Sequence, residues 1–363
     1  MEKAKIPVEN DLLNTCARVA PLSQEEFAVA RARLDTLTKP LGSLGRLEDI
    51  AAQWVASRQK DAGAPICKAV YVFAADHGVT VEGVSAYPSA VTHQMVLNFL
   101  GDGAAINVLA RLHDARLRVV DVGVDADLEE HPLLIPRKVA RGTANMACDA
   151  AMTDEQVSFA LSVGLEQANK AAASGQNLVA IGEMGIGNTT AASAITSALT
   201  GNSADLVTGT GTGINDDVRM HKAAVINRAL DRHFDKIPHA DPIAILRNVG
   251  GLEIAAMTGM VVGLASHRIV SVCDGFISTA AAALAVALQP KVRGYLIAGH
   301  QSVEPGHRLL LDHLGLEPLL SLKMRLGEGT GAVLAMSIVE SAIALYLKMA
   351  TFKSAGISEV TDD

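Results

Sequence analysis

Short apolar runs that end in polar or glycine-rich turns recur along most of the chain. Five such runs are present: residues 69–78 (AVYVFAADHG), 116–123 (RLRVVDVG), 177–185 (NLVAIGEMG), 268–275 (RIVSVCDG) and 294–301 (GYLIAGHQ). Continuous apolar runs of this length are typical of strands that are buried on both faces of a parallel sheet. Helical segments separate them, so the pattern predicts a Rossmann-like α/β fold, a parallel β-sheet flanked by helices.

Helical patterns dominate both ends of the chain. Ser23 and Glu26 form a capping-box pattern before Phe27, Ala30 and Leu34, which have helical spacing, and residues 46–58 predict a second helix. Residues 38–45 (TKPLGSLG) contain a proline and two glycines, so they predict an ordered turn between the two helices.

A long apolar helix is predicted over residues 331–350. It has the length of a membrane span, but Ser337, Glu340 and Ser341 lie at its centre, and a carboxylate in lipid costs about 2.5 kcal/mol or more. We therefore predict a buried or interface helix that packs on the N-terminal pair. Residues 1–66 and 332–363 would form a small helical domain, and residues 67–331 an α/β catalytic domain.

Composition and charge limit the partners. The formal charge is −8, from 31 basic and 39 acidic residues without a basic stripe, which argues against nucleic acid. The first ten residues lack the apolar core of a signal peptide, and the four cysteines lie far apart, as expected of buried thiols in a reducing compartment. We expect a cytoplasmic protein that does not bind a membrane.

Two glycine-rich turns predict a phosphorylated ligand. Residues 182–190 (GEMGIGNTT) join a strand to a helix, and residues 208–214 (TGTGTGI) precede a helix that carries Lys222. Free backbone N–H groups at a helix N-terminus favour anions. Neither turn is a Walker A motif, and the first strand lacks the dinucleotide fingerprint, so a triphosphate or NAD is disfavoured.

Histidines near strand ends invite a metal interpretation. Asp76, His77, His93, His300 and His307 are the best-placed candidates, but no recognised ligand spacing is present. Structural hydrogen bonding is the commoner role of such histidines, and we predict neither a metal nor a cofactor.

Glu317 is a candidate general base. It lies between apolar neighbours just before Pro318, and a carboxylate shielded from water removes protons well. The alternative is that Glu317 points into solvent from a loop.

Several segments together resemble the nicotinate-nucleotide:dimethylbenzimidazole phosphoribosyltransferase family. They are residues 38–45 (TKPLGSLG), 74–79 (AADHGV), 182–190 (GEMGIGNTT), 299–307 (GHQSVEPGH), 314–320 (LGLEPLL) and 324–331 (MRLGEGTG). The resemblance implies a homodimer that transfers the phosphoribosyl group of nicotinate mononucleotide to 5,6-dimethylbenzimidazole, in the lower-ligand branch of cobalamin biosynthesis. Neither a metal nor another cofactor is implied.

The resemblance also implies residue roles. Glu317 would be the catalytic base, Glu183 would stabilise positive charge, and Ser85, Gln94 and Leu316 would border the benzimidazole. Phosphate and ribose contacts would come from Met184, Gly185, Ile186, Gly187, Asn188, Thr189, Gly209, Thr210, Gly211, Thr212, Gly213 and Lys222. Two alternatives stay open: a metal-dependent hydrolase or isomerase that uses Asp76, His77 and His300, and a nucleotide-binding regulator without turnover.

Overall fold

The computed structural model describes residues 7–211, 213–234 and 241–358. Its centre is a six-stranded sheet in the order β3-β2-β1-β4-β5-β6, in which all neighbouring strands are parallel. The strands are β1 (Lys68–Ala75), β2 (Ala115–Gly123), β3 (Leu134–Pro136), β4 (Leu178–Met184), β5 (Val270–Cys273) and β6 (Leu296–Ala298). The predicted fold class and all five predicted strands are confirmed.

Strand β3 was not predicted. It has three residues, it ends in a proline, and it lies at the edge of the sheet, where Val119 pairs with Leu134. A segment this short carries no periodic signal, and proline is tolerated at an edge because no further strand needs its missing N–H group.

The strand order reverses beside β1. The chain runs outward from β1 to β2 and β3, and then returns to the other side of β1 with β4, β5 and β6. Connections on the two sides of such a switch point diverge, so a crevice opens beyond the carboxyl ends of the strands. The segments that follow β4, β5 and β6 all lead to this edge.

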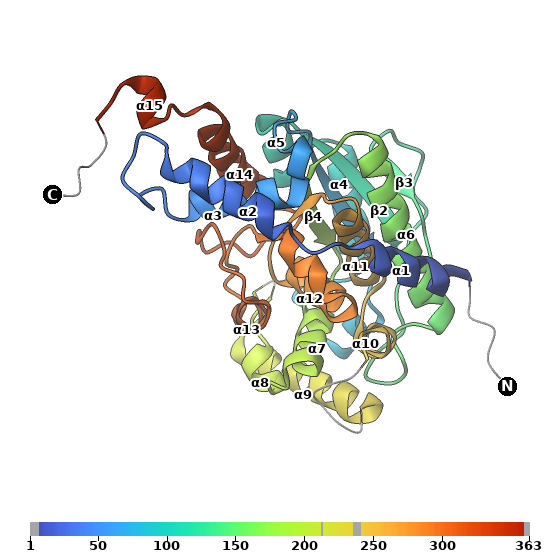
Figure 1. The fold of residues 1–363 in the computed structure, drawn as a ribbon. Helices are drawn as coiled ribbons and strands as arrows, with labels where there is room; N and C mark the ends of the chain where they lie inside the picture. Colours follow the sequence, from blue (N-terminus) through green and yellow to red (C-terminus); the bar gives the residue numbers. More distant parts are fainter. Residues whose placement is uncertain (1–6, 212, 235–240, 359–363) are drawn as a thin grey trace.

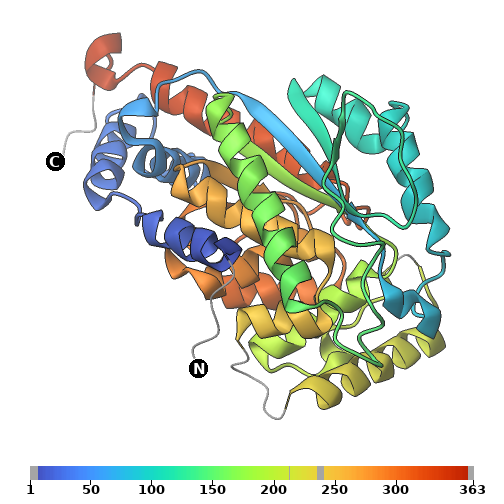
Figure 2. The ribbon, with the colours of Figure 1, turned by 90° about the vertical axis from the view of Figure 1, so that its right-hand side faces the viewer.

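Helices cover both faces of the sheet (Figures 1 and 2). In β1, Tyr71 and Phe73 pack with the core on one side, and Val70 and Val72 with the core on the other. The first side is covered by α1 (Pro7–Arg18), α6 (Asp154–Ala173), α7 (Asn188–Thr200), α10 (Pro242–Val249), α11 (Leu252–Ser266) and α12 (Phe276–Leu288). The second is covered by α2 (Gln24–Asp35), α3 (Arg46–Arg58), α4 (Ala90–Leu100), α5 (Ala105–Leu112) and α14 (Thr330–Lys348).

Shorter elements and connecting helices complete the fold. They are η1 (Gln59–Asp61), η2 (Gly78–Glu82), α8 (Ala204–Val207), α9 (Asp216–His233), η3 (Pro290–Tyr295), α13 (Pro305–Leu314) and α15 (Phe352–Ala355). Helix α9, which carries Lys222, packs on α7 and α8, so the two glycine-rich turns lie on adjoining elements.

Helices α6 and α11 lie in close contact because glycines leave room for the opposite backbone. A Cβ atom at Gly164 would overlap the carbonyl oxygen of Ala256, and one at Gly259 would overlap that of Leu161. The first face of the sheet is therefore covered by a tightly packed helix pair.

The two ends of the chain meet. Ser23 Oγ accepts a hydrogen bond from Glu26 N (3.2 Å) at the start of α2, α3 contacts both α2 and α14, and Leu37 forms an isolated bridge with Thr351. Helix α1 instead packs on α6 and α11. The division into a helical domain and a catalytic domain stays a prediction.

Two helical stretches among the described residues have the length and composition of a membrane span. Thr330–Lys348 is more than half buried, and Ala90–Leu112 is one-third buried and is broken into α4 and α5. Helix α14 packs against β4, β5, α3 and α5, as expected of a core helix in a folded domain.

Candidate functional site

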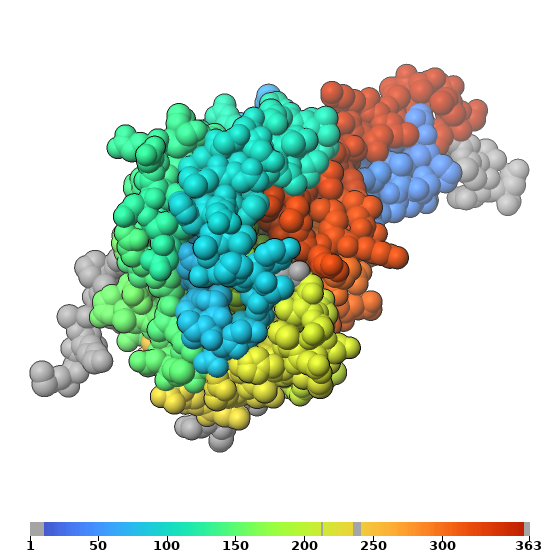
Figure 3. All heavy atoms as spheres, turned by 180° about the vertical axis from the view of Figure 1, so that it is seen from behind, coloured from blue at the N-terminus to red at the C-terminus, as the bar shows by residue number. Residues whose placement is uncertain are grey.

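A cavity of about 380 Å³ opens beyond the carboxyl ends of β4, β5 and β6. It is hollowed into the face shown in Figure 3, between the blue-to-cyan segment that carries α4 and the orange-red segment after α13. Its lining comes from six segments: residues 87–95, 183–189, 211, 274–278, 300–304 and 325–328. Residues far apart in sequence thus form one site.

The first glycine-rich turn forms one wall of the cavity. Ile186 N donates a hydrogen bond to Thr92 Oγ1 (3.0 Å), and Asn188 N donates to Gly185 O (3.1 Å). Gly187 has a φ of 95°, which favours glycine, and it caps the N-terminus of α7. The turn presents Gly185, Asn188 and the start of the helix to the cavity, where an anion would be stabilised.

Lys222 lies behind this turn. Its ammonium group donates a hydrogen bond to Thr189 Oγ1 (2.7 Å), and the side chain is fully buried. Burial lowers the pKa of Lys222 to about 8, although the nearby carboxylate of Glu304 opposes the shift. A phosphate dianion in the cavity would favour the charged ammonium.

The second glycine-rich turn is held by Glu304. Gly211 N donates a hydrogen bond to Glu304 Oε1 (2.8 Å), and a Cβ atom at Gly209 would overlap the same carboxylate. Gly213 N bonds back to Thr210 O (2.9 Å). Both turns therefore meet at Lys222 and Glu304.

Carboxylates are concentrated in the cavity: Glu183, Asp274, Glu304 and Glu328 are buried and line it. Burial, together with the charges of Asp274 and Glu253, raises the pKa of Glu183 to about 8, although Asn188 donates to its carboxylate. Burial also raises the pKa of Asp274 and of Glu328. A cationic group in the cavity would pull these carboxyls toward their ionised forms.

His300 also lines the cavity. It is buried, neither ring nitrogen has a hydrogen-bond partner among the described residues, and its Nε2 lies 3.7 Å from Asp274 Oδ1. By contrast, His307 Nδ1 accepts a hydrogen bond from Ser302 N (2.9 Å), and its Nε2 lies 3.0 Å from Thr279 Oγ1. Burial lowers the pKa of His307 to about 3, so this ring is neutral and structural.

Apolar side chains form another wall. Tyr87, Val91 and Met95 come from α4 and the segment before it, and Met184 and Leu326 line the same cavity. A flat aromatic ring would find an apolar surface here, in the same cavity as the charged groups.

Glu317 lies outside the cavity lining. Leu320 pairs with His300 just after β6, and Gly315 contacts Arg293 just before β6, so Glu317, between them in sequence, lies toward the amino end of that strand. Its side chain is 70% exposed and contacts Arg46, with Arg46 Nε 3.4 Å from Glu317 Oε2. The structure therefore places the predicted base on the outer surface of its own chain.

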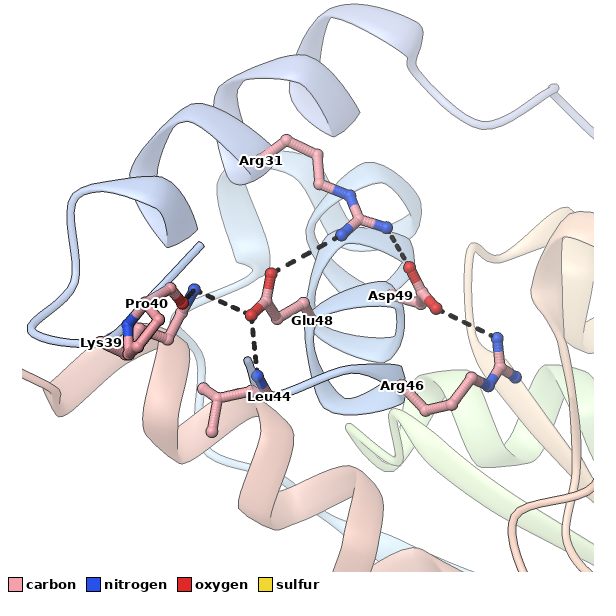
Figure 4. Close-up of polar contacts among 7 residues, drawn as sticks. All are labelled: Arg31, Lys39, Pro40, Leu44, Arg46, Glu48 and Asp49. Atoms are coloured by element: carbon pink, nitrogen blue, oxygen red, sulfur yellow. Dashed lines mark hydrogen bonds and ion pairs between the residues drawn. The ribbon is translucent and has the colours of Figure 1, made fainter. Parts of the chain in front are cut away.

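The turn at residues 38–45 fixes the position of Arg46. Figure 4 shows Glu48 between Lys39 and Arg31, and Asp49 between Arg31 and Arg46. The Lys39–Glu48 pair is buried at 2.8 Å, and Leu44 N donates to the same carboxylate (3.1 Å). The turn is thus closed by a buried ion pair next to the surface that carries Glu317.

Most of the other predicted site residues line the cavity or support its lining, and three lie elsewhere. Glu183, Met184, Gly185, Ile186, Asn188, Thr189 and Gly211 line the cavity, and Gly187, Gly209, Thr210, Gly213 and Lys222 support it from the same two turns. Ser85 lies outside the lining but accepts a hydrogen bond from Tyr87 N (3.2 Å), and Gln94 is exposed on α4. Leu316 packs on the core, and Thr212 lies outside the described residues.

Sequence reasoning missed several lining residues. Asp274 lay at the end of a quoted apolar run, His300 was considered only as a metal candidate, and Glu304 and Glu328 were inside quoted motifs without an assignment. Their position directly after β5 and β6, or within a glycine-rich segment, was the available signal. Among residues 7–211, 213–234 and 241–358, no three His, Cys, Asp or Glu side chains form a group that could hold a metal ion.

The family model described as phosphoribosyltransferase matches residues 19–357. The chain belongs to this phosphoribosyltransferase family. A relative from Geobacter sulfurreducens, named nicotinate-nucleotide–dimethylbenzimidazole phosphoribosyltransferase, is 51% identical over 96% of this chain and 98% of its own length. A relative of the same name from Chloroflexus aurantiacus is 51% identical over 95% and 98%.

The fold of this family member also matches a solved structure. The crystal structure of CobT from Thermus thermophilus has a TM-score of 0.89 and 48% identity, and the match covers 93% of this chain and 100% of that chain. The resemblance predicted from the motifs is therefore confirmed.

Proposed function

We propose that this protein transfers the 5-phosphoribosyl group of nicotinate mononucleotide to 5,6-dimethylbenzimidazole, which yields α-ribazole 5′-phosphate and nicotinate for the lower-ligand branch of cobalamin biosynthesis. The observation that carries the proposal is 51% identity over nearly the whole length of relatives named for this activity. The cavity supports it, because its glycine-rich turns and Lys222 suit a phosphate while its apolar wall suits a flat base.

The reaction needs few chemical groups. One ring nitrogen of the benzimidazole attacks C1′ of the ribose, and the bond electrons leave with the nicotinate ring nitrogen, which becomes a neutral pyridine. Positive charge develops at C1′, and the carboxylates of Glu183 and its neighbours would stabilise it. The proton on the second ring nitrogen passes to a base, which we propose to be Glu317.

We further propose a cytoplasmic homodimer in which Glu317 acts at the cavity of the other protomer. Support comes from the position of Glu317, which is exposed, ion-paired with Arg46 and outside the lining of its own cavity. The acidic balance of 31 basic and 39 acidic residues agrees with a protein that binds neither nucleic acid nor anionic membranes.

The test incubates the purified protein with nicotinate mononucleotide and dimethylbenzimidazole in EDTA, and follows nicotinate and ribazole phosphate by mass. We expect product from the wild type and a loss of about 10²–10⁴-fold in kcat for Glu317→Gln. Wild-type turnover in Glu317→Gln would remove its role as base. No product from the wild type would contradict the proposed function.

A further inference from the structure

The segment at residues 74–79 (AADHGV) contains a buried ion pair that the proposed mechanism does not use. His77 is the second residue after the end of β1, and Glu253 lies in the first turn of α11. His77 Nε2 and Glu253 Oε1 are 2.6 Å apart, and their side chains are 1% and 0% exposed. Removing two charges from water is costly, so such a pair in a stable fold calls for a physical explanation.

The pair lies directly beneath the first glycine-rich turn. A Cβ atom at Gly185 would lie 3.3 Å from His77 Cδ2 and 3.4 Å from Glu253 Oε1, and one at Gly187 would lie 3.3 Å from His77 Cβ. On the opposite side, a Cβ at Gly251 would overlap the His77 ring. The ring and the carboxylate thus fill the space between α11 and the two glycines of the turn, Gly185 and Gly187, which have no side chains of their own.

The charges around His77 favour the ionised form of the His77–Glu253 pair. Burial lowers the pKa of His77, but the charge and hydrogen bond of Glu253 and the charge of Asp76 outweigh it, so the pKa lies above its ordinary value. Glu253 Oε2 and Asp76 Oδ1 are buried without a hydrogen-bond partner among the described residues. The imidazolium therefore places one positive charge beside these two buried carboxylates.

We propose that His77 and Glu253 are positioning residues for phosphoribosyl transfer: together they hold the turn at residues 185–188 in the position from which Asn188 and the N–H groups not bonded within the protein face the bound nucleotide. The inference rests on the proposed function. Neither side chain lines the cavity, so the pair acts through the turn and not on the substrate.

The experiment measures steady-state kinetics of Glu253→Gln, His77→Gln and the double variant. Each single variant is expected to raise the KM for nicotinate mononucleotide at least tenfold and to leave the KM for dimethylbenzimidazole within twofold. The double variant is expected to recover most of the loss, because two amides can hydrogen bond without leaving a buried charge unpaired.

The matched control is Asp121→Asn. Asp121 is a buried carboxylate near the end of the neighbouring strand β2, and it is paired with Lys138 at 2.9 Å, but it is not among the groups that the turn rests on. This variant is expected to lower stability without changing either KM.

Three results decide the inference. If the single variants fold, keep wild-type KM values and lose only melting temperature, as Asp121→Asn should, the inference is overturned. If the single variants do not fold, Glu253→Asp carries the test: a threefold or larger rise in nucleotide KM supports the pair, and an unchanged KM overturns it. A wild type that makes no product overturns the proposed function and this inference with it, whereas product with unchanged KM values in the variants overturns only the inference.

Discussion

Glu183 occupies an environment that departs clearly from that of an ordinary glutamate. Its pKa of about 8 means that the folded protein holds a proton that the unfolded chain releases at about pH 4.5. The native state therefore loses stability as pH rises from the lower value toward the higher one. A carboxyl that costs stability at neutral pH is typical of a functional site.

We expect Glu183→Gln to stabilise the empty protein increasingly as pH rises. Its melting temperature should match that of the wild type near pH 5 and exceed it by about 2 °C or more at pH 8, because only the wild type has a carboxyl that stays protonated in the folded state and ionises in the unfolded state. Calorimetry across this range checks the prediction, and equal melting temperatures at both pH values would contradict it. The variant should lose turnover at the same time.

Replacing Lys222 should weaken the binding of nicotinate mononucleotide but not that of dimethylbenzimidazole. Lys222→Gln removes the buried ammonium that bonds to Thr189, and loss of one charge-assisted hydrogen bond to phosphate costs about 1.5–3 kcal/mol, or roughly 10–100-fold in affinity. Titration calorimetry with nicotinate mononucleotide measures the loss. An unchanged affinity would mean that the phosphate lies elsewhere.

At the scale of elements, the α6–α11 contact determines how tightly one face of the sheet is covered. Gly164→Ala places a methyl group against the carbonyl oxygen of Ala256, which is backbone and cannot swing away. We expect a loss of about 1–3 kcal/mol in the free energy of unfolding, measured with urea. Gly63→Ala, where nothing lies within 4 Å, is the control and should differ little from the wild type.

The sequence predicted most elements because their signals are local. Residues 46–58 have the bounds of α3, and the five apolar runs became strands, whereas β3 was too short to predict. The site was only partly predictable because its residues come together through contacts between segments distant in sequence. Glu304 and Arg46 take their positions from loops that meet only in the folded chain, and exposure of Glu317 follows from how residues 316–320 run beside β6.

At the scale of the whole molecule, the position of Glu317 predicts a test with mixed dimers. Glu317→Gln lowers kcat, and Lys222→Gln is nearly inactive when the nucleotide concentration is far below its raised KM. If Glu317 serves the other protomer, co-expression of the two variants gives mixed dimers with one intact site, and random pairing restores about a quarter of wild-type activity. If both residues served the same chain, no site would be intact and activity would stay absent.

The meeting of the two chain ends has a consequence for biosynthesis. Helices α2 and α3 leave the ribosome well before α14, on which α3 packs. At typical elongation rates, roughly 15–60 s separate the two events. Throughout that interval, apolar side chains such as Leu34, Leu37 and Trp54, buried in the finished protein, lack their final neighbours. A chaperone that shields α2 and α3 until α14 has been made would protect these apolar side chains from association during synthesis.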